Sequence, residues 1–232
     1  MNALVKECFN YFKDCGFTYA ICGGYAIELF LNKSIRNTHS DIDISIFDED
    51  RKAVVDFMLK QGWGIFQNIK INPDFKGGSA SQIKSSDDER VLNVHCAWAI
   101  RPNSTTFKVT PSVENNIFNY KIINKNQTDF DYIEILFNSK YNDDFICDKN
   151  KGVARAMNKA ILYVDKIPYL SPELILFFKS PPAYLESGYH KEKCQADFDE
   201  AIPFLSIESK QWLIAALEKT YPDGHKWLER LK

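Results

Sequence analysis

A short stretch with strict alternation of side-chain types constrains this chain more than any other feature. Between residues 41 and 46, isoleucines at the even positions alternate with Asp41, Asp43 and Ser45. Successive side chains of a β-strand point to opposite faces of the sheet, so the pattern predicts a strand with one buried, apolar face. The same alternation places the two carboxylates close together on the other face. Any fold of this chain has to accommodate two neighbouring negative charges.

The residues before this strand are typical of a turn that approaches an anion. Residues 17–22 form a short apolar run that predicts a buried strand, Gly23 and Gly24 follow it, and residues 25–31 show a helical pattern. Glycine has no Cβ, so its backbone can come close to a ligand. The first turn of a helix presents N–H groups and the positive end of the helix dipole. Together these features indicate a phosphate-binding element.

A second alternating strand, predicted for residues 131–138, carries a third acid. Glu134 lies on the face opposite Ile133, Ile135 and Phe137. If helices cover that apolar face, Glu134 points to the same side as the acid pair, as a third metal ligand or as the base that accepts a hydroxyl proton. Adjacent carboxylates repel each other unless a cation lies between them. Magnesium is the expected cation, because it binds hard oxygen ligands and phosphate oxygens together.

The rest of the chain favours an α+β fold with a mixed sheet. We expect helices at residues 3–12 and 50–61, strands at 63–71, 91–100 and 116–123, and a loop or frayed hairpin at 72–90. From about residue 148 the pattern becomes helical, and Ser171 followed by proline and glutamate is a favourable helix start. The predicted domains are therefore a mixed α/β domain at 1–148 and a mainly helical one at 149–232.

Composition narrows the class of partner. The 232 residues carry a net charge of −2 with scattered lysines, whereas proteins that bind long nucleic acids need a basic patch. The six cysteines show no zinc spacing. No signal peptide is visible at the start of the sequence, and no apolar run approaches the roughly 20 residues that span a bilayer. We expect a cytoplasmic protein with a small-molecule partner and no membrane association.

The motifs resemble a known family. Gly23 and Gly24, a helix, Arg36 and then the pair Asp41 and Asp43 resemble the signature of the polymerase-β-like nucleotidyltransferases. More narrowly, the run 23–44 is similar to the antibiotic adenylyltransferases of the aminoglycoside 2″-O type and the lincosamide type, and to uncharacterised bacterial relatives. The resemblance spans most of the chain, because later pieces also look like those relatives: residues 132–136, 168–173, Lys179 and residues 197–198.

The resemblance implies a reaction and a set of site residues. ATP, or another NTP, with Mg²⁺ would donate a nucleoside monophosphate to a hydroxyl of a small acceptor, such as an antibiotic, while pyrophosphate leaves. Asp41, Asp43 and Glu134 would form the catalytic, metal-binding set. Residues 149–232 would help to form the acceptor pocket, in a monomer or a homodimer. The implied nucleotide contacts come from Gly23, Gly24, Arg36, Ser40 and Lys179.

Some interpretations stay open at this point. Tyr25 replaces the tryptophan that family members commonly have after the glycines, and Cys194 stands where relatives often carry an acid. The acceptor could instead be a protein or an RNA end, as in a toxin–antitoxin pair, or the chain could be a non-catalytic nucleotide-binding module. Lys179 fits a helix-end lysine favoured by the helix dipole equally well. We interpret His39 as a loop residue; the expected packing residues are His95, Trp98 and Trp212.

Overall fold

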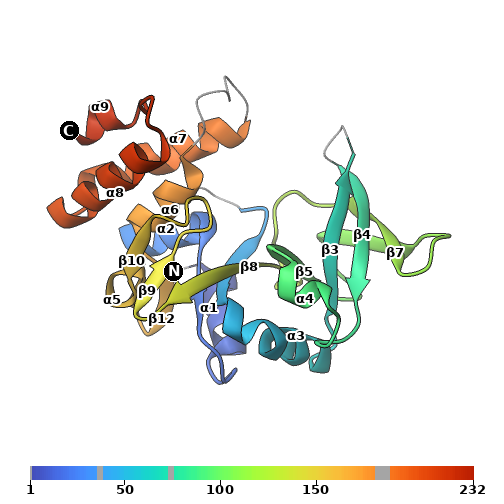
Figure 1. Ribbon diagram of the computed structural model, residues 1–232. Coiled ribbons are helices and arrows are strands. Elements are labelled where there is room, and N and C mark those ends of the chain that lie inside the picture. The colour runs from blue at the N-terminus through green and yellow to red at the C-terminus, as the bar shows by residue number, and fades with distance from the viewer. Residues whose placement is uncertain (1, 36–38, 73–75, 181–188) are drawn as a thin grey trace. The chain divides into compact units, whose positions relative to one another are not determined.

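The computed structural model of this chain, shown in Figure 1, describes residues 2–35, 39–72, 76–180 and 189–232. By compactness it separates into two units. The first contains Met1–Ile21 and Arg36–Asn138, and the second contains Cys22–Ile35 and Ser139–Lys232. Residues 22–35 therefore group with the C-terminal part of the chain. The division into functional domains at residue 148 is a separate question and stays a prediction.

The first unit contains a mixed sheet with short helices, as the α+β prediction requires. Its order along the chain is α1 (Ala3–Phe12), β1 (Tyr19–Ile21), β2 (Ile42–Phe47), α3 (Arg51–Lys60), β3 (Gly64–Ile71), β4 (Gly77–Ile83), α4 (Arg90–Asn93), β5 (Cys96–Ile100), β6 (Phe107–Pro111), β7 (Ile117–Ile122) and most of β8 (Tyr132–Tyr141). A single 3-10 turn, Asp48–Asp50, leads from β2 into α3.

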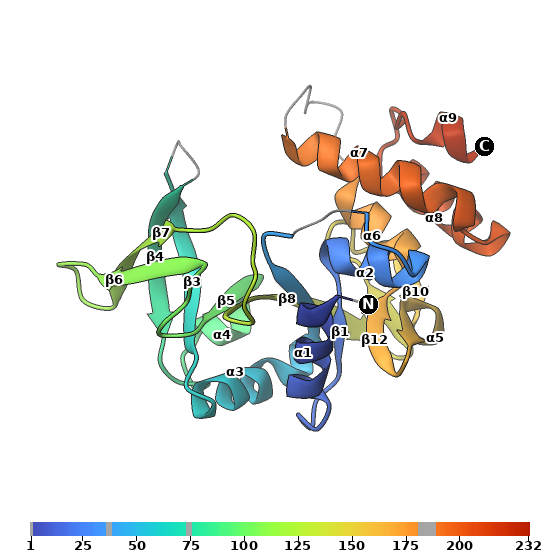
Figure 2. The ribbon, with the colours of Figure 1, turned by 180° about the vertical axis from the view of Figure 1, so that it is seen from behind.

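The strands of the first unit follow the order β1-β2-β8-β5-β3-β4-β7-β6. Strands β2 and β8 run parallel, and the other pairings between neighbours in this order are antiparallel. The strands β3, β4 and β7 stand side by side in Figure 1, and Figure 2 shows β6 next to β7 from behind. The sheet thus brings β2 and β8 together, although about 90 residues separate them in the sequence.

One face of this sheet is the core of the unit. The side chains of Ile42, Ile44 and Ile46 on β2 are fully buried, as are those of Ile133 and Ile135 on β8. Helix α3 packs against β2 and β3, and an aromatic contact between Phe12 and Phe57, with ring centroids 5.7 Å apart, joins α1 to α3. The predicted burial of the isoleucine face is confirmed.

Two segments of the first unit differ from the sequence prediction. For residues 72–90 a loop or frayed hairpin was expected; the hairpin alternative is partly correct, because residues 77–83 form the strand β4, which pairs with β3 and also with β7. Residues 90–93 form the short helix α4 before the strand β5, where a continuous β-like segment was expected. The close approach of the neighbouring strands explains why β4 begins with two glycines. A Cβ on Gly77 or Gly78 would lie within 2.4 Å of a backbone oxygen of a neighbouring strand. The glycines that suggested a loop are instead needed for tight strand packing.

The second unit is helical with short strands. It contains α2 (Gly23–Leu31), the end of β8, β9 (Asp144–Ile146), β10 (Ala154–Ala156), α5 (Met157–Ala160), β11 (Ile161–Val164), β12 (Ile167–Leu170), α6 (Pro172–Lys179), α7 (Tyr189–Ala201), α8 (Ile207–Thr220) and α9 (Leu228–Leu231). The predicted helix start at Pro172 is confirmed, and α6 packs against α2, α7 and α8. The short strands β9 to β12 were not predicted. A bilayer-crossing helix is absent from the described part of the chain.

The buried isoleucines of β2 generate a prediction about stability. Replacing Ile44 by alanine leaves a cavity behind the acid-bearing strand, so we expect the free energy of unfolding to fall by about 2–5 kcal/mol. Chemical denaturation followed by circular dichroism measures this change. The control is Ile207→Ala, because Ile207 is 78% exposed, and its expected effect stays within about 0.5 kcal/mol. Equal effects for the two variants would contradict the burial of β2.

Candidate functional site

Three carboxylates meet on the sheet face opposite the isoleucines of the first unit. The parallel register of β2 and β8 pairs Asp43 directly with Glu134. Asp41 lies two residues before Asp43, immediately ahead of β2, so it points to the same side. One carboxylate oxygen from each of the three residues lies within 4.8 Å of the other two, and all three residues are half-buried. The predicted convergence of these acids is present in the structure.

The polar segment ahead of β2 is held in place by hydrogen bonds within the first unit. The Ser40 hydroxyl donates to Asp41 Oδ1 at 2.9 Å. The backbone N–H of Gln127 donates to the carbonyl of His39 at 2.8 Å, and its side-chain Nε2 donates to the carbonyl of Tyr132 at 2.8 Å. Gln127 is only 3% exposed. It therefore ties the residues that enter β2 to those that enter β8, which fixes Asp41 relative to Glu134.

A cysteine on the neighbouring strand β5 contacts the third acid. The thiol of Cys96 donates to Glu134 Oε1 at 2.8 Å. Sequence reasoning missed both Cys96 and Gln127. Cys96 has no cysteine or histidine partner at a recognisable spacing, and a single glutamine in a polar segment carries no pattern. Only the pairing of β5 with β8 reveals the contact.

The electrostatics of the cluster are visible in a nearby tyrosine. Burial raises the pKa of Tyr132 well above its ordinary value, and the negative charges of Glu134, Asp41 and Asp43 raise this pKa further. Burial is the larger cause, and the carboxylates add to it because they disfavour a further negative charge nearby. Three carboxylates this close together attract a cation by their own charge.

The donor set fits magnesium. Two ligand oxygens on opposite sides of one Mg²⁺ ion are about 4 Å apart, because each Mg–O distance is about 2.1 Å. Neighbouring oxygens around the ion are about 3 Å apart. One oxygen from each of the three carboxylates lies within 4.8 Å of the other two, which is close to these spacings. All three donors are hard oxygens, which Mg²⁺ prefers. Asp41, Asp43 and Glu134 could therefore hold the ion together with phosphate oxygens or water.

Three further predicted site residues, Gly23, Gly24 and Lys179, are part of the second unit. Gly23 begins α2 with a left-handed φ of 63°, a conformation that glycine adopts at little cost. Gly24 is buried in the first turn. Lys179 ends α6 and forms an ion pair with Asp197, Nζ to Oδ2 2.5 Å, beneath the surface of the second unit. Its predicted contact with a triphosphate stays a prediction, as do those of the glycines. Arg36 lies outside the described residues.

The comparisons with known proteins give slight likenesses only. No protein-family model matches the chain, and no curated protein matches its sequence. A crystal structure of the lincosamide antibiotic adenylyltransferase LnuA, lincomycin-bound, has a TM-score of 0.47 at 13% identity, over 85% of this chain and 96% of that chain. A solution structure of the antibiotic-resistance factor ANT(2″)-Ia has a TM-score of 0.48 at 13% identity, over 95% of this chain and 92% of that chain.

A crystal structure of ANT(2″)-Ia in complex with adenylyl-2″-tobramycin has a TM-score of 0.47 at 11% identity, over 94% of this chain and 97% of that chain. Because these TM-scores lie below 0.5, the likenesses are too slight to assign an activity to this chain. The chemical interpretation rests on its own residues.

The acid cluster generates a prediction about metal-dependent stability. Two like charges about 4 Å apart repel by about 4 kcal/mol at an effective dielectric constant of about 20, and by less where solvent screens them. Without metal, Asp43→Asn removes part of this repulsion, so its melting temperature should rise by about 2–4 °C for each kcal/mol relieved. With saturating Mg²⁺, the wild type should gain stability and Asp43→Asn should gain little.

Thermal unfolding in EDTA and in 10-fold steps of MgCl₂ measures both effects. The matched control is Asp14→Asn, because Asp14 is an exposed aspartate outside the cluster. This control should respond to Mg²⁺ as the wild type does. A wild-type melting temperature that is indifferent to Mg²⁺ would remove the metal site from consideration.

Proposed function

We propose that this chain is a magnesium-dependent nucleotidyltransferase that moves a nucleoside monophosphate, AMP from ATP, to a hydroxyl of a small acceptor. The observation that carries the proposal is the convergence of Asp41, Asp43 and Glu134 on two parallel-paired strands. A purely structural sheet face has no need for three carboxylates in mutual contact range, because their repulsion opposes folding. The motif resemblance around Gly23, Gly24 and the acid pair supports the same chemistry.

Each residue of the cluster has a role in this proposal. Asp41 and Asp43 hold the metal, and Glu134 is the third ligand or takes the proton of the acceptor hydroxyl. When bound, Mg²⁺ supplies positive charge that offsets the charge developing on the transferring phosphoryl group. Ser40 and Gln127 keep Asp41 in position through the hydrogen bonds of the segment ahead of β2.

The transfer balances as a displacement at the α-phosphorus. The acceptor oxygen forms a bond to this phosphorus while the bond to the bridging oxygen breaks, and pyrophosphate leaves with that electron pair. The hydroxyl proton goes to Glu134 or to solvent. The net charge of −2 favours a small acceptor over a polyanion, and a hydroxylated antibiotic, an aminoglycoside or a lincosamide, is the proposed class. The reaction would take place in the cytoplasm, where ATP is supplied.

The proposal predicts label transfer that depends on the acid pair. Purified protein, ATP labelled at the α-phosphate and Mg²⁺ are incubated with a panel of aminoglycosides and lincosamides, and products are separated by thin-layer chromatography. We expect a labelled adduct with the wild type and a rate at least about 100-fold lower with Asp43→Asn. Glu134→Gln should lower the rate about 100-fold or more if Glu134 acts as the base.

Asp14→Asn is again the matched control and should leave the rate unchanged, because Asp14 lies outside the cluster. Label found on a co-expressed protein or on RNA instead would reassign the acceptor. Absence of any transfer, together with ATP binding that ignores Mg²⁺, would sink the enzymatic proposal.

A further inference from the structure

The sheet face that carries the acids continues into a cluster of aromatic side chains, of which Trp98 is partly exposed. Cross-strand partners run in one row through four strands. Asp43 on β2 pairs with Glu134 on β8, and Glu134 pairs with Trp98 on β5. Trp98 in turn pairs with Phe66 on β3. Side chains of directly paired residues lie on the same face, about 5 Å apart at their Cβ atoms in antiparallel pairs. Trp98 is therefore the next side chain after Glu134, on the side away from Asp43.

The aromatic surface is preorganised around Trp98. The indole ring contacts Tyr120 edge-on, with centroids 5.1 Å apart, and Tyr132, with centroids 6.2 Å apart. Phe107 lies 5.9 Å from the same ring. Buried members of this cluster include Phe66, Tyr120 and Tyr132, whereas Trp98 itself stays partly exposed. Edge-to-face contacts of this kind fix the plane of a ring, so the exposed part of Trp98 is a rigid apolar surface.

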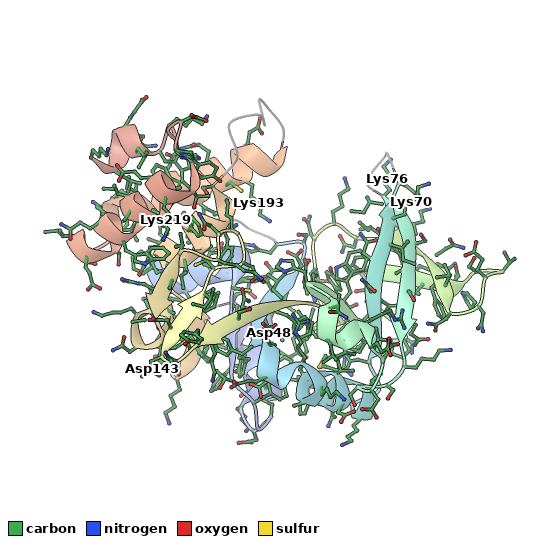
Figure 3. The ribbon with its side chains drawn as sticks, in the orientation of Figure 1. Asp48, Lys70, Lys76, Asp143, Lys193 and Lys219 are labelled. Atoms are coloured by element: carbon green, nitrogen blue, oxygen red, sulfur yellow. The ribbon has the colours of Figure 1, made fainter. Side chains whose placement is uncertain are left out.

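Amide side chains flank this surface. Gln82 is the cross-strand partner of Phe66, so it lies on the same face. Asn68 accepts a hydrogen bond from the hydroxyl of Tyr120, 3.3 Å between heavy atoms. An amide group can both donate and accept, which matches hydroxyls. Two lysines of the hairpin formed by β3 and β4, Lys70 and Lys76, lie near its tip in Figure 3.

The combination of an aromatic face, flanking amides and an adjacent acid selects a class of ligand. A saturated ring with hydroxyl substituents presents C–H bonds on its flat side, and their partial positive charge is attracted to the negative face of an aromatic ring. Its hydroxyls can then meet the amides at the rim. A ring that lies over Trp98 also brings one hydroxyl next to Glu134, because the two residues are cross-strand partners.

We propose that the exposed face of Trp98 is the surface on which the acceptor lies, and that it positions a hydroxylated ring so that one hydroxyl meets Glu134. This inference rests on the proposed nucleotidyl transfer and adds the residue that binds the acceptor. It gives Trp98 a role in addition to packing: the buried rings around it hold the indole, and its exposed part binds. The nucleotide then contacts other residues, so the loss of Trp98 leaves nucleotide binding intact.

Intrinsic fluorescence in the absence of ATP and Mg²⁺ tests this proposal without requiring turnover. Trp63 and Trp227 are at most 2% exposed, which leaves Trp98 and Trp212 as the tryptophans that a ligand can reach. Titration with tobramycin, lincomycin and methyl α-D-glucopyranoside should change the fluorescence of the wild type and of Trp212→Phe. Trp98→Phe should give no change. Trp212 is a matched control, because it is also partly exposed and donates to the carbonyl of Ala154 at 2.8 Å.

Calorimetry separates binding from the optical signal. Trp98→Phe keeps an aromatic face and should bind the same compound within a few-fold of the wild-type Kd, whereas Trp98→Ala should weaken binding about 10-fold or more. The Kd of MgATP should not change in either variant. Circular dichroism and thermal unfolding establish that both variants fold, and Trp98→Phe keeps the test decisive if Trp98→Ala does not.

The outcomes distinguish this proposal from the proposed function. A Trp98-dependent response without any label transfer would support the acceptor surface and count against the enzyme. Label transfer by the wild type, together with an acceptor affinity that Trp98→Ala leaves unchanged, would support the enzyme and count against the acceptor surface. Two further results overturn the acceptor surface. A Trp98-dependent fluorescence change with ATP alone would assign this face to the nucleobase. The absence of a Trp98-dependent change with every compound of the panel would leave the acceptor surface without a ligand.

Discussion

The parallel register between β2 and β8 is the constraint on which the candidate site depends. It sets Asp43 opposite Glu134 and places Asp41 one pleat away on the same side. A shift of one residue in this pairing would turn the acids of one strand towards the core and its isoleucines towards solvent. Burial of Ile42, Ile44 and Ile46 on β2 opposes such a shift. The apolar face of the strand therefore determines on which side of the sheet the carboxylates lie.

The cluster combines negative charge with a rigid support. The carboxylates repel each other, yet the core behind the strands and the hydrogen bonds of Gln127 hold them within reach of one another. For the proposed metal, a site held in this way would need little reorganisation to bind the ion. The antiparallel pairing of β5 with β8 then extends the same face to Cys96 and Trp98. Metal binding and acceptor positioning are thus proposed for neighbouring residues of one sheet.

Much of the secondary structure around the candidate site and the diglycine follows from local patterns. Alternation predicted β2 and β8 together with the direction of Glu134, and the apolar run and diglycine predicted β1 and α2. The sequence left β4 open between a loop and a frayed hairpin because Gly77 and Gly78 look like loop residues, and only the neighbouring backbones show why a side chain does not fit there. Gln127 and Cys96 escaped because each acts through a partner distant in sequence, Tyr132 and Glu134 respectively. Nothing in the sequence around Gln127 or Cys96 marks either residue, and only their positions in the fold bring them to the site.

The sequence by itself determined which residues are proposed to carry the chemistry, two aspartates with a shared direction and a glutamate on the polar face of another strand, and which apolar residues each strand buries. These properties are local, because the two-residue period of a strand fixes direction without reference to any partner. The tertiary structure decided which strands are neighbours, and therefore that Glu134 lies between Asp43 and Trp98. It also grouped residues 22–35 with the C-terminal part of the chain. Pairing between distant segments depends on how a whole core closes, and no local period encodes it.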